Sequence, residues 1–132
     1  MLTRDRLVEH TFRIAASLIF VVAGLGHVGR PEQMVAQLSH APFGAWALGI
    51  APARTLVLLA GPPLIAGGLA LMLGLRTRLA ALTLLALLVP ITLTTHVGYG
   101  GGVGPLFKNL ALAGALLHFA HHGHTVAAGD RS

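Results

Sequence analysis

The sequence predicts an all-α integral membrane protein, a four-helix bundle formed by a single domain over residues 1–132. Hydrophobic residues make up 55% of the chain and charged residues only 10%, against about 25% charged residues in soluble domains. Nine basic and four acidic side chains are too few to cover a small core in water. Two long stretches without an ionisable side chain also follow one another across a short turn. We therefore expect lipid to be the solvent around the helices.

The two central helices are the clearest. Residues 55–74 and residues 79–95 contain no ionisable side chain. A helix needs about 20 residues to cross roughly 30 Å of hydrocarbon, so we expect transmembrane helices over 55–74 and 79–97. Only four residues separate the two stretches, which predicts an antiparallel hairpin. Gly74 suits the left-handed position that ends the first of these helices.

The two outer helices are shorter apolar stretches that must continue through polar residues. We expect them over 8–28 and 105–122. In the first helix Arg13 is expected to snorkel toward the near interface, with Glu9 one turn earlier as its candidate partner. A cleaved signal peptide is the competing interpretation of this segment, although acidic residues interrupt its basic region.

The connection between the first two helices, residues 30–54, is too polar to span and too long for a simple turn. Pro31 can begin a short helix there, with Met34 and Leu38 on its apolar side. Phe43 and Trp46 suit the depth of the membrane interface. We expect this connection to lie on the outer surface of the membrane as a short interfacial segment.

The orientation follows from the basic residues. With four spans, the N-terminus, the turn at 75–78 and the C-terminus share one side. That side carries six basic residues and the other side three: Arg4, Arg6, Arg13, Arg76, Arg78 and Arg131, against Arg30, Arg54 and Lys108. Because basic residues favour the cytoplasmic side, we expect the N-in/C-in orientation.

Composition also restricts the chemistry. The net charge of +5 comes from basic residues scattered singly along the chain, so the basic stripe that nucleic-acid binding requires is missing and we expect no nucleic-acid partner. There is no cysteine, which excludes disulfides and thiolate chemistry. If the protein takes part in redox reactions, the electrons reside on a bound molecule or a partner.

Unusual polar side chains gather at the outer end of the predicted bundle. The topology brings together five candidate ligand-binding residues, which we call the rim residues: His27, Arg54, His96, Lys108 and Asn109. Ionisable groups near a membrane interior cost free energy and are functional candidates by default, the alternative being that each reaches singly to the headgroups. Since Asp and Glu are absent from 33–129, we expect a rim without a carboxylate. Such a rim suits a small anion or the carbonyl oxygens of a quinone. Haem ligation by two histidines is a weaker alternative that nothing in the sequence demands.

A second cluster of histidines closes the last helix at the inner side. His118, His121 and His122 have the spacing of one helical face, which permits metal binding, and His124 follows them. The competing interpretation is that imidazoles at a helix C-terminus simply favour the helix dipole and the interface. We assign no metal site.

Three stretches resemble the DoxX family of small bacterial membrane proteins. They are Phe20-Val21-Val22-Ala23-Gly24-Leu25-Gly26-His27, the stretch from Gly67 to Leu79 (GGLALMLGLRTRL), and the stretch from Phe107 to Leu117 (FKNLALAGALL). The resemblance covers about residues 12–120, and it implies a four-helix, multi-pass protein of the bacterial cytoplasmic membrane. Family members are linked to thiosulfate:quinone oxidoreduction and to membrane complexes that counter oxidative stress. Relatives commonly carry lysine at the position of His27, so this chain has a donor there without a permanent charge.

Two functions remain open from the sequence. The first is a redox-linked membrane subunit of a quinone-linked oxidoreductase, holding a quinone or a small anion at the rim. The second is a non-catalytic anchor or assembly subunit of a partner complex, the partners being an oxidoreductase subunit or a second copy of the chain. A transport role ranks last, because four helices leave little room for a water-filled path and no inverted repeat is evident. Whether the chain is itself an enzyme stays open.

Overall fold

The computed structural model describes residues 3–97 and 103–123, apart from the side chain of His96. Within this part the chain is all-helical and contains no strand. The elements in chain order are α1 (Arg4–Gly29), α2 (Pro31–His40), α3 (Gly44–Leu48), α4 (Ala53–Leu73), α5 (Thr77–Ile91), the π-helix η1 (Thr92–His96) and α6 (Gly104–His122).

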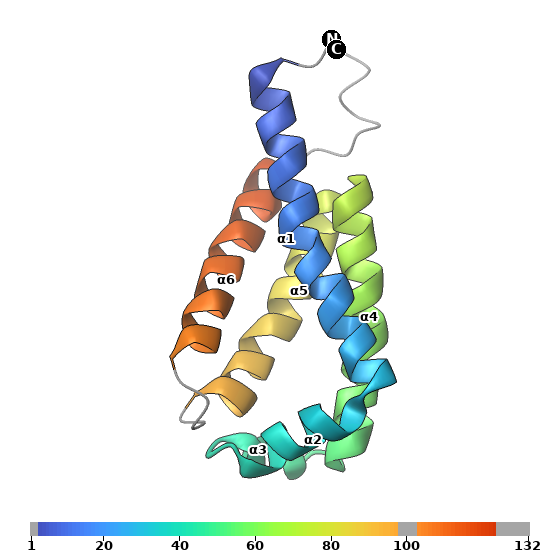
Figure 1. Cartoon of the computed structure of the whole chain (residues 1–132), viewed down its shortest axis with the longest axis vertical. Helices are drawn as coiled ribbons and strands as arrows, with labels where there is room; N and C mark the ends of the chain where they lie inside the picture. The colour runs from blue at the N-terminus through green and yellow to red at the C-terminus, as the bar shows by residue number, and fades with distance from the viewer. Residues whose placement is uncertain (1–2, 98–102, 124–132) are drawn as a thin grey trace.

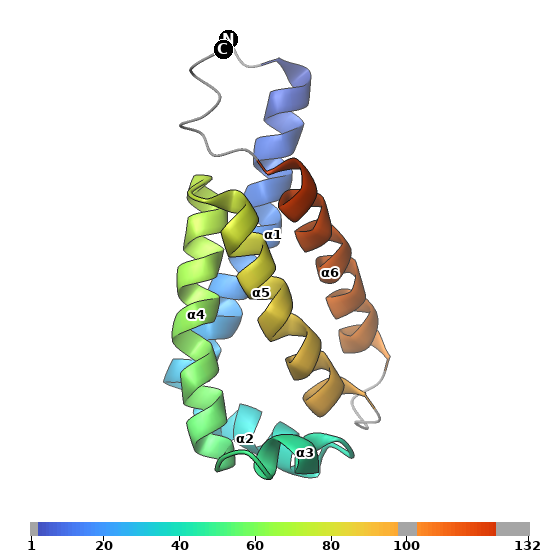
Figure 2. The same ribbon diagram turned by 180° about the vertical axis from the view of Figure 1, so that it is seen from behind.

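Four long helices, α1, α4, α5 and α6, run side by side, and the two short helices cross one end of them (Figure 1). The start of α1, the α4–α5 turn and the end of α6 lie at one end, which we call the N-terminal end. The opposite end, which we call the α2 end, carries α2, α3 and η1 (Figure 2). Contacts run mainly from α1 to α4, from α4 to α5 and from α5 to α6.

Helix α1 begins at Arg4, four residues before the predicted start. Thr3 explains the difference, because its hydroxyl accepts a hydrogen bond from the backbone N–H of Arg6 and so caps the helix. Asp5 in the first turn favours the same start through the helix dipole. The first turns of α1 therefore extend beyond the ends of the neighbouring helices (Figure 1).

Glycines bring α1 and α4 into close contact. A Cβ atom at Gly24 would lie 2.8 Å from the backbone oxygen of Gly61 and 2.6 Å from the Ile65 side chain. Farther along the same interface, a Cβ atom at Gly68 would lie 2.8 Å from the Val21 side chain. The two helices can approach this closely only because these positions have no side chain, as small residues permit in membrane bundles.

The α4–α5 turn has the expected glycine at its start. Gly74 ends α4 with a φ of 72°, which confirms the left-handed position predicted for it. Arg76 also adopts a left-handed conformation, with a φ of 44° and a ψ of 50°, and precedes the first residue of α5. An arginine in this region costs roughly 1–2 kcal/mol relative to ordinary backbone conformations.

The third predicted helix ends differently from expectation. The sequence predicts one regular helix over 79–97, whereas α5 gives way after Ile91 to the π-helix η1, and the backbone N–H of Val97 donates to the carbonyl of Thr92, five residues earlier. Pro90 provides the physical reason, because it has no N–H and its ring clashes with the preceding turn. The helix accommodates it by widening instead of stopping.

The connection over residues 30–54 forms two short helices, where the sequence predicts one short helix that begins at Pro31. Pro31 occupies the first turn of α2, as predicted, and Leu38 is buried against the bundle. Phe43 and Trp46 are both exposed. These two short helices cover the α2 end of the bundle (Figure 1).

Three described helical segments are long and apolar enough to cross a membrane: Arg4–Gly29, Ala53–Leu73 and Thr77–Thr95. This supports the prediction of a multi-pass membrane protein. Helix α6 does not belong to this group, because Lys108, Asn109 and three histidines reduce its apolar content. Its 19 residues correspond to about 28 Å at 1.5 Å per residue.

Candidate functional site

The strongest polar contact between helices at the α2 end joins α6 to the end of α5. Asn109 lies in the second turn of α6 and is only 4% exposed. Its Nδ2 donates a hydrogen bond to Thr92 Oγ1 at 2.9 Å, and Thr92 Oγ1 donates to the carbonyl of Leu88. An amide nitrogen carries two hydrogens, so one N–H of Asn109 remains for another acceptor.

The π-helix η1 supplies the acceptor for Asn109 and is itself stabilised by hydroxyl groups. Thr92, Thr94 and Thr95 each donate to the carbonyl four residues earlier. In a segment where the backbone hydrogen-bond pattern changes register, these hydroxyls compensate carbonyls that the regular helix would have used. Short π-helical segments occur frequently at functional sites.

Helix α2 adds a residue that the sequence interpretation missed. Gln37 Nε2 donates to the backbone carbonyl of Thr95 at 3.4 Å and so links α2 to η1. One feature of the sequence pointed to Gln37, because it immediately precedes Leu38, the apolar residue expected to face the bundle and found buried in α2. The contact could not be predicted, because it depends on how α2 folds back over the bundle.

His27 lies in the last turn of α1 and is 8% exposed. Its Nδ1 lies 2.7 Å from the carbonyl of Ala23. A carbonyl can only accept, so Nδ1 carries the hydrogen, and in the neutral ring Nε2 is then the acceptor. Among the described residues no hydrogen bond to Nε2 is found, so this nitrogen can accept one from a ligand.

The ion pair of Arg54 contradicts the prediction that the rim contains no carboxylate. Its Nη1 lies 3.4 Å from Oε1 of Glu32, and the two side chains are 64% and 74% exposed. Glu32 precedes the carboxylate-free stretch in the sequence, but α2 folds back over the bundle and brings it beside the start of α4. The prediction was therefore wrong on this point, and Arg54 forms an exposed ion pair at the outside of the α2 end.

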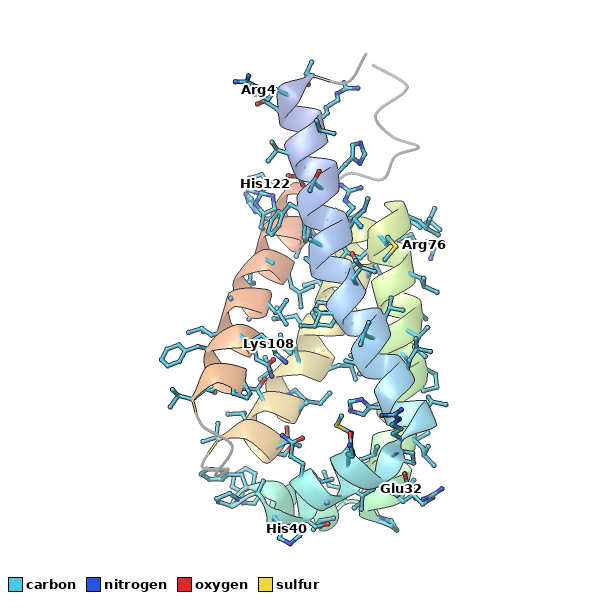
Figure 3. All side chains as sticks on the ribbon, viewed as in Figure 1. Arg4, Glu32, His40, Arg76, Lys108 and His122 are labelled. Carbon is cyan, nitrogen blue, oxygen red and sulfur yellow. The ribbon has the colours of Figure 1, made fainter. Side chains whose placement is uncertain are left out.

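The two remaining rim residues are Lys108 and His96. Lys108 is exposed near the start of α6 (Figure 3). Its neighbour Asn109 is buried, because consecutive residues on a helix point in different directions. His96 ends η1, and its side chain lies outside the described part of the structure.

A second group of polar side chains lies at the N-terminal end. It contradicts the prediction that Arg13 snorkels to the interface with Glu9 as its partner. Arg13 is 8% exposed, its Nε is buried without a hydrogen-bond partner, and its guanidinium carbon lies 6.0 Å from the centre of the Phe119 ring. Glu9 does not pair with Arg13, because its Oε2 lies 3.4 Å from Nε2 of His118 on α6. Arg13 faces the helix packing instead of the interface because it belongs to the buried stripe of α1.

The histidines at the end of α6 contact one another. The ring centres of His118 and His122 are 4.7 Å apart, and those of His121 and His122 are 4.6 Å apart. Within residues 3–97 and 103–123, no group of three metal-ligating side chains has a geometry suited to a metal ion. His124 lies outside the described residues.

The α2 end thus combines a buried amide with a spare donor, an imidazole with a free nitrogen and an exposed ammonium group. The amide and the ammonium group can donate hydrogen bonds to the oxygens of a small anion or of a quinone, and the imidazole Nε2 can accept a hydrogen bond. The residues present therefore fit either ligand chemically.

Comparisons with known proteins give one match. A family model described as DoxX matches residues 9–97, about two thirds of the chain. The match stops before the Phe107–Leu117 stretch, so the resemblance noted there carries no support from it. No curated protein and no solved structure matches the chain. The matched segment contains most of α1 and all of α2, α3, α4, α5 and η1, and the chain belongs to the DoxX family.

Proposed function

We propose that the chain is a redox-linked subunit of the bacterial cytoplasmic membrane, which holds a quinone or a small anion at the α2 end. The observation that carries the proposal is the buried Asn109, whose amide uses one N–H on Thr92 and has another to offer. A buried polar group in a membrane bundle is a functional candidate because its burial costs free energy unless it is satisfied.

In this proposal α6 is the fourth transmembrane span, and both chain ends face the cytoplasm. The support is that α6 is long enough for the hydrocarbon core and ends beside α1 near the N-terminal end of the bundle (Figure 1). Lys108 and Asn109 then lie near the membrane interface at the start of α6. Toward its other end, His118 of α6 pairs with the partly buried Glu9 of α1. Neither position exposes an unpaired charge to the centre of the bilayer.

Each candidate residue then has a distinct role. Asn109 donates to an oxygen of the ligand, and Lys108 reaches the mouth of the site from its exposed position. His27, held by the carbonyl of Ala23, exchanges a proton at Nε2, and His96 supplies a second imidazole. Arg54 contributes to the electrostatic potential at this end but does not contact the ligand, because it already pairs with Glu32. A bound quinone would supply the electron-carrying chemistry that the side chains lack.

The single tryptophan offers a direct test. Trp46 lies on α3, which contacts η1, so a quinone at the α2 end should quench its fluorescence. We expect a short-chain benzoquinone to quench Trp46 saturably in nanodiscs. Lys108→Ala and Asn109→Leu should each weaken binding by about tenfold, which corresponds to about 1.4 kcal/mol. Sulfate should displace the quinone if both ligands share the site.

Arg30→Gln is the matched control, because Arg30 is an exposed cation at the same end. It should leave the binding constant within about twofold. Quenching that rises linearly in every variant would report partition of the quinone into lipid and would sink the proposal.

A second candidate function, that of an anchor or assembly subunit, has its own supporting observation. Gly114 on α6 is exposed, and a Cβ atom there would meet nothing within 4 Å. Ala111, one turn earlier, is also exposed. These small residues leave room for close approach of a helix of a partner oxidoreductase subunit or of a second copy.

The anchor function predicts that bulk at Gly114 disrupts an assembly and leaves the α2 end intact. Gly114→Leu should release the partner in native mass spectrometry, whereas Ala86→Leu on the exposed face of α5 should not. Loss of the partner together with unchanged Trp46 quenching would favour the anchor function. An unchanged mass in both variants would exclude this surface of α6 as the interface.

A further inference from the structure

Two hollows meet at the α4–α5 turn, at the opposite end from the rim residues. The larger, of about 670 Å³, follows α4 and α5 from Pro63 to Arg76. The smaller, of about 320 Å³, lies between the turn, Leu82 and Gly123. Arg76 and Leu79 border both hollows.

Small side chains create the larger hollow. Ala66, Gly67 and Ala70 of α4 border it, and Ala80 and Thr83 of α5 lie opposite. A larger residue at Gly67 would require the Leu84 side chain to shift, because a Cβ atom there would lie 2.9 Å from it. The result is an apolar groove on the side of the bundle, with a positive end.

The length of this groove matches one leaflet of a membrane. From Pro63 to Gly74 the α4 helix advances about 16 Å at 1.5 Å per residue. Half of a hydrocarbon core roughly 30 Å thick is about 15 Å. An acyl chain that follows the groove therefore begins at the turn, at headgroup depth, and ends near the middle of the bilayer.

Among the residues that the structure describes, no carboxylate pairs with the positive end of the groove. Arg76 and Arg78 form the turn, and the sequence has no acidic residue from 33 to 129. Within the part of the chain that the structure describes, the carboxylates that form ion pairs are Glu9 and Glu32, with His118 and Arg54. Arg76 borders both hollows from a left-handed backbone conformation that is costly for a non-glycine residue, and the first turn of α5 has no side-chain cap.

We propose that this surface binds one acidic phospholipid, with its phosphate between Arg76 and Arg78 and an acyl chain in the α4–α5 groove. The charge at the mouth and the leaflet length of the groove together match an anionic headgroup joined to a hydrocarbon chain. The second acyl chain follows the smaller hollow past Leu79 and Leu82. The uncapped start of α5 adds backbone N–H groups that favour the phosphate.

Native mass spectrometry of the full chain tests this site with phosphatidylglycerol and phosphatidylcholine as the probes. We expect the wild-type chain to retain one phosphatidylglycerol at least fivefold more than phosphatidylcholine. Arg76→Asn combined with Arg78→Gln should abolish that preference. Asparagine is chosen because it tolerates the left-handed conformation. A groove-filling variant, Ala70→Phe, should reduce retention although both arginines remain.

Arg4→Gln combined with Arg6→Gln is the matched control, since it removes the same charge from exposed residues at the same end. It should keep the preference within about twofold. An equal loss in this control would mean general charge attraction and would overturn the proposal. Equal retention of the two lipids would also overturn it, as would binding of inorganic phosphate that does not change in Ala70→Phe. If a second copy of the chain is bound and Ala70→Phe releases it, the groove is a contact between two copies, and the proposal is overturned as well. Circular dichroism melting confirms that each variant remains folded.

Discussion

Two of the five polar side chains that are buried in the described part of the bundle form hydrogen bonds within their own helix. Ser17 donates to the carbonyl of Arg13, and His27 donates to the carbonyl of Ala23. Asn109 differs, because its hydrogen bond joins two elements, α6 and η1. Removal of a buried partner leaves a polar group without compensation, so this residue should matter for packing as well as for the proposed ligand.

A double-mutant cycle on Asn109→Ala and Thr92→Ala should measure that contact. We expect a coupling free energy of about 0.5–1.5 kcal/mol, the usual net value of a hydrogen bond between helices in a membrane. The measurement is reversible unfolding in mixed micelles. Thr94→Ala gives the control, because Thr94 bonds only within its own helix. Additive effects of Asn109→Ala and Thr92→Ala would mean that the contact contributes nothing.

Arg13 permits a different prediction at the same scale. Its Nε is buried without a partner, and an apolar side chain of similar length avoids the free energy that burial of an unsatisfied polar group costs. Arg13→Met should therefore leave the melting temperature in detergent unchanged or raise it by a few degrees. A large fall would show that the guanidinium binds something that holds α1 against α6.

At the scale of elements, the glycines of α4 have separate partners. Gly61 and Gly68 face α1, whereas Gly67 faces Leu84 of α5. One helix therefore packs closely against two neighbours through different glycines. Helix α6 has no equivalent contact at Gly114, which leaves its outer surface free.

Alanine at Gly24 and at Gly114 should have opposite effects on stability. At Gly24 the new Cβ would lie within 3 Å of two backbone atoms of α4, so we expect a loss of about 1–3 kcal/mol from overpacking. At Gly114 the Cβ has open space, and the higher helix propensity of alanine should add up to about 1 kcal/mol. Unfolding in mixed micelles compares the two. A neutral Gly24→Ala would contradict the close α1–α4 contact.

At the scale of the whole molecule, the arrangement of the helices decides the two ends. Helices α1, α4 and α5 with η1 supply three apolar spans, and α6 returns the chain to the N-terminal end (Figure 1). The predicted orientation places the six basic residues of the N-terminus, the α4–α5 turn and the C-terminus in the cytoplasm.

The absence of cysteine makes this orientation directly measurable. A membrane-impermeant maleimide should label Ser39→Cys on α2 in intact cells. It should label Thr3→Cys and His121→Cys only after the membrane is permeabilised. Labelling of His121→Cys in intact cells would place the end of α6 outside and would reduce the number of spans to three.

Sequence reasoning succeeded where local pattern was sufficient and failed where distant segments meet. The turn at Gly74 and the start of α2 at Pro31 follow from backbone preferences of single residues, and both are present. The pairings of Arg54 with Glu32 and of Glu9 with His118 join residues 22 and 109 positions apart. No local pattern specifies such contacts.

By itself, the sequence determined the all-helical class, the apolar spans and the short turn between α4 and α5, because these depend on hydropathy and on glycine and proline at given positions. Only the tertiary structure decided that Asn109 faces Thr92, that Arg13 faces Phe119, and that the groove ends at Arg76. The rotation of each helix about its axis decides these contacts. In a chain that is apolar on most sides, hydropathy leaves that rotation open, and close packing at the glycines sets it.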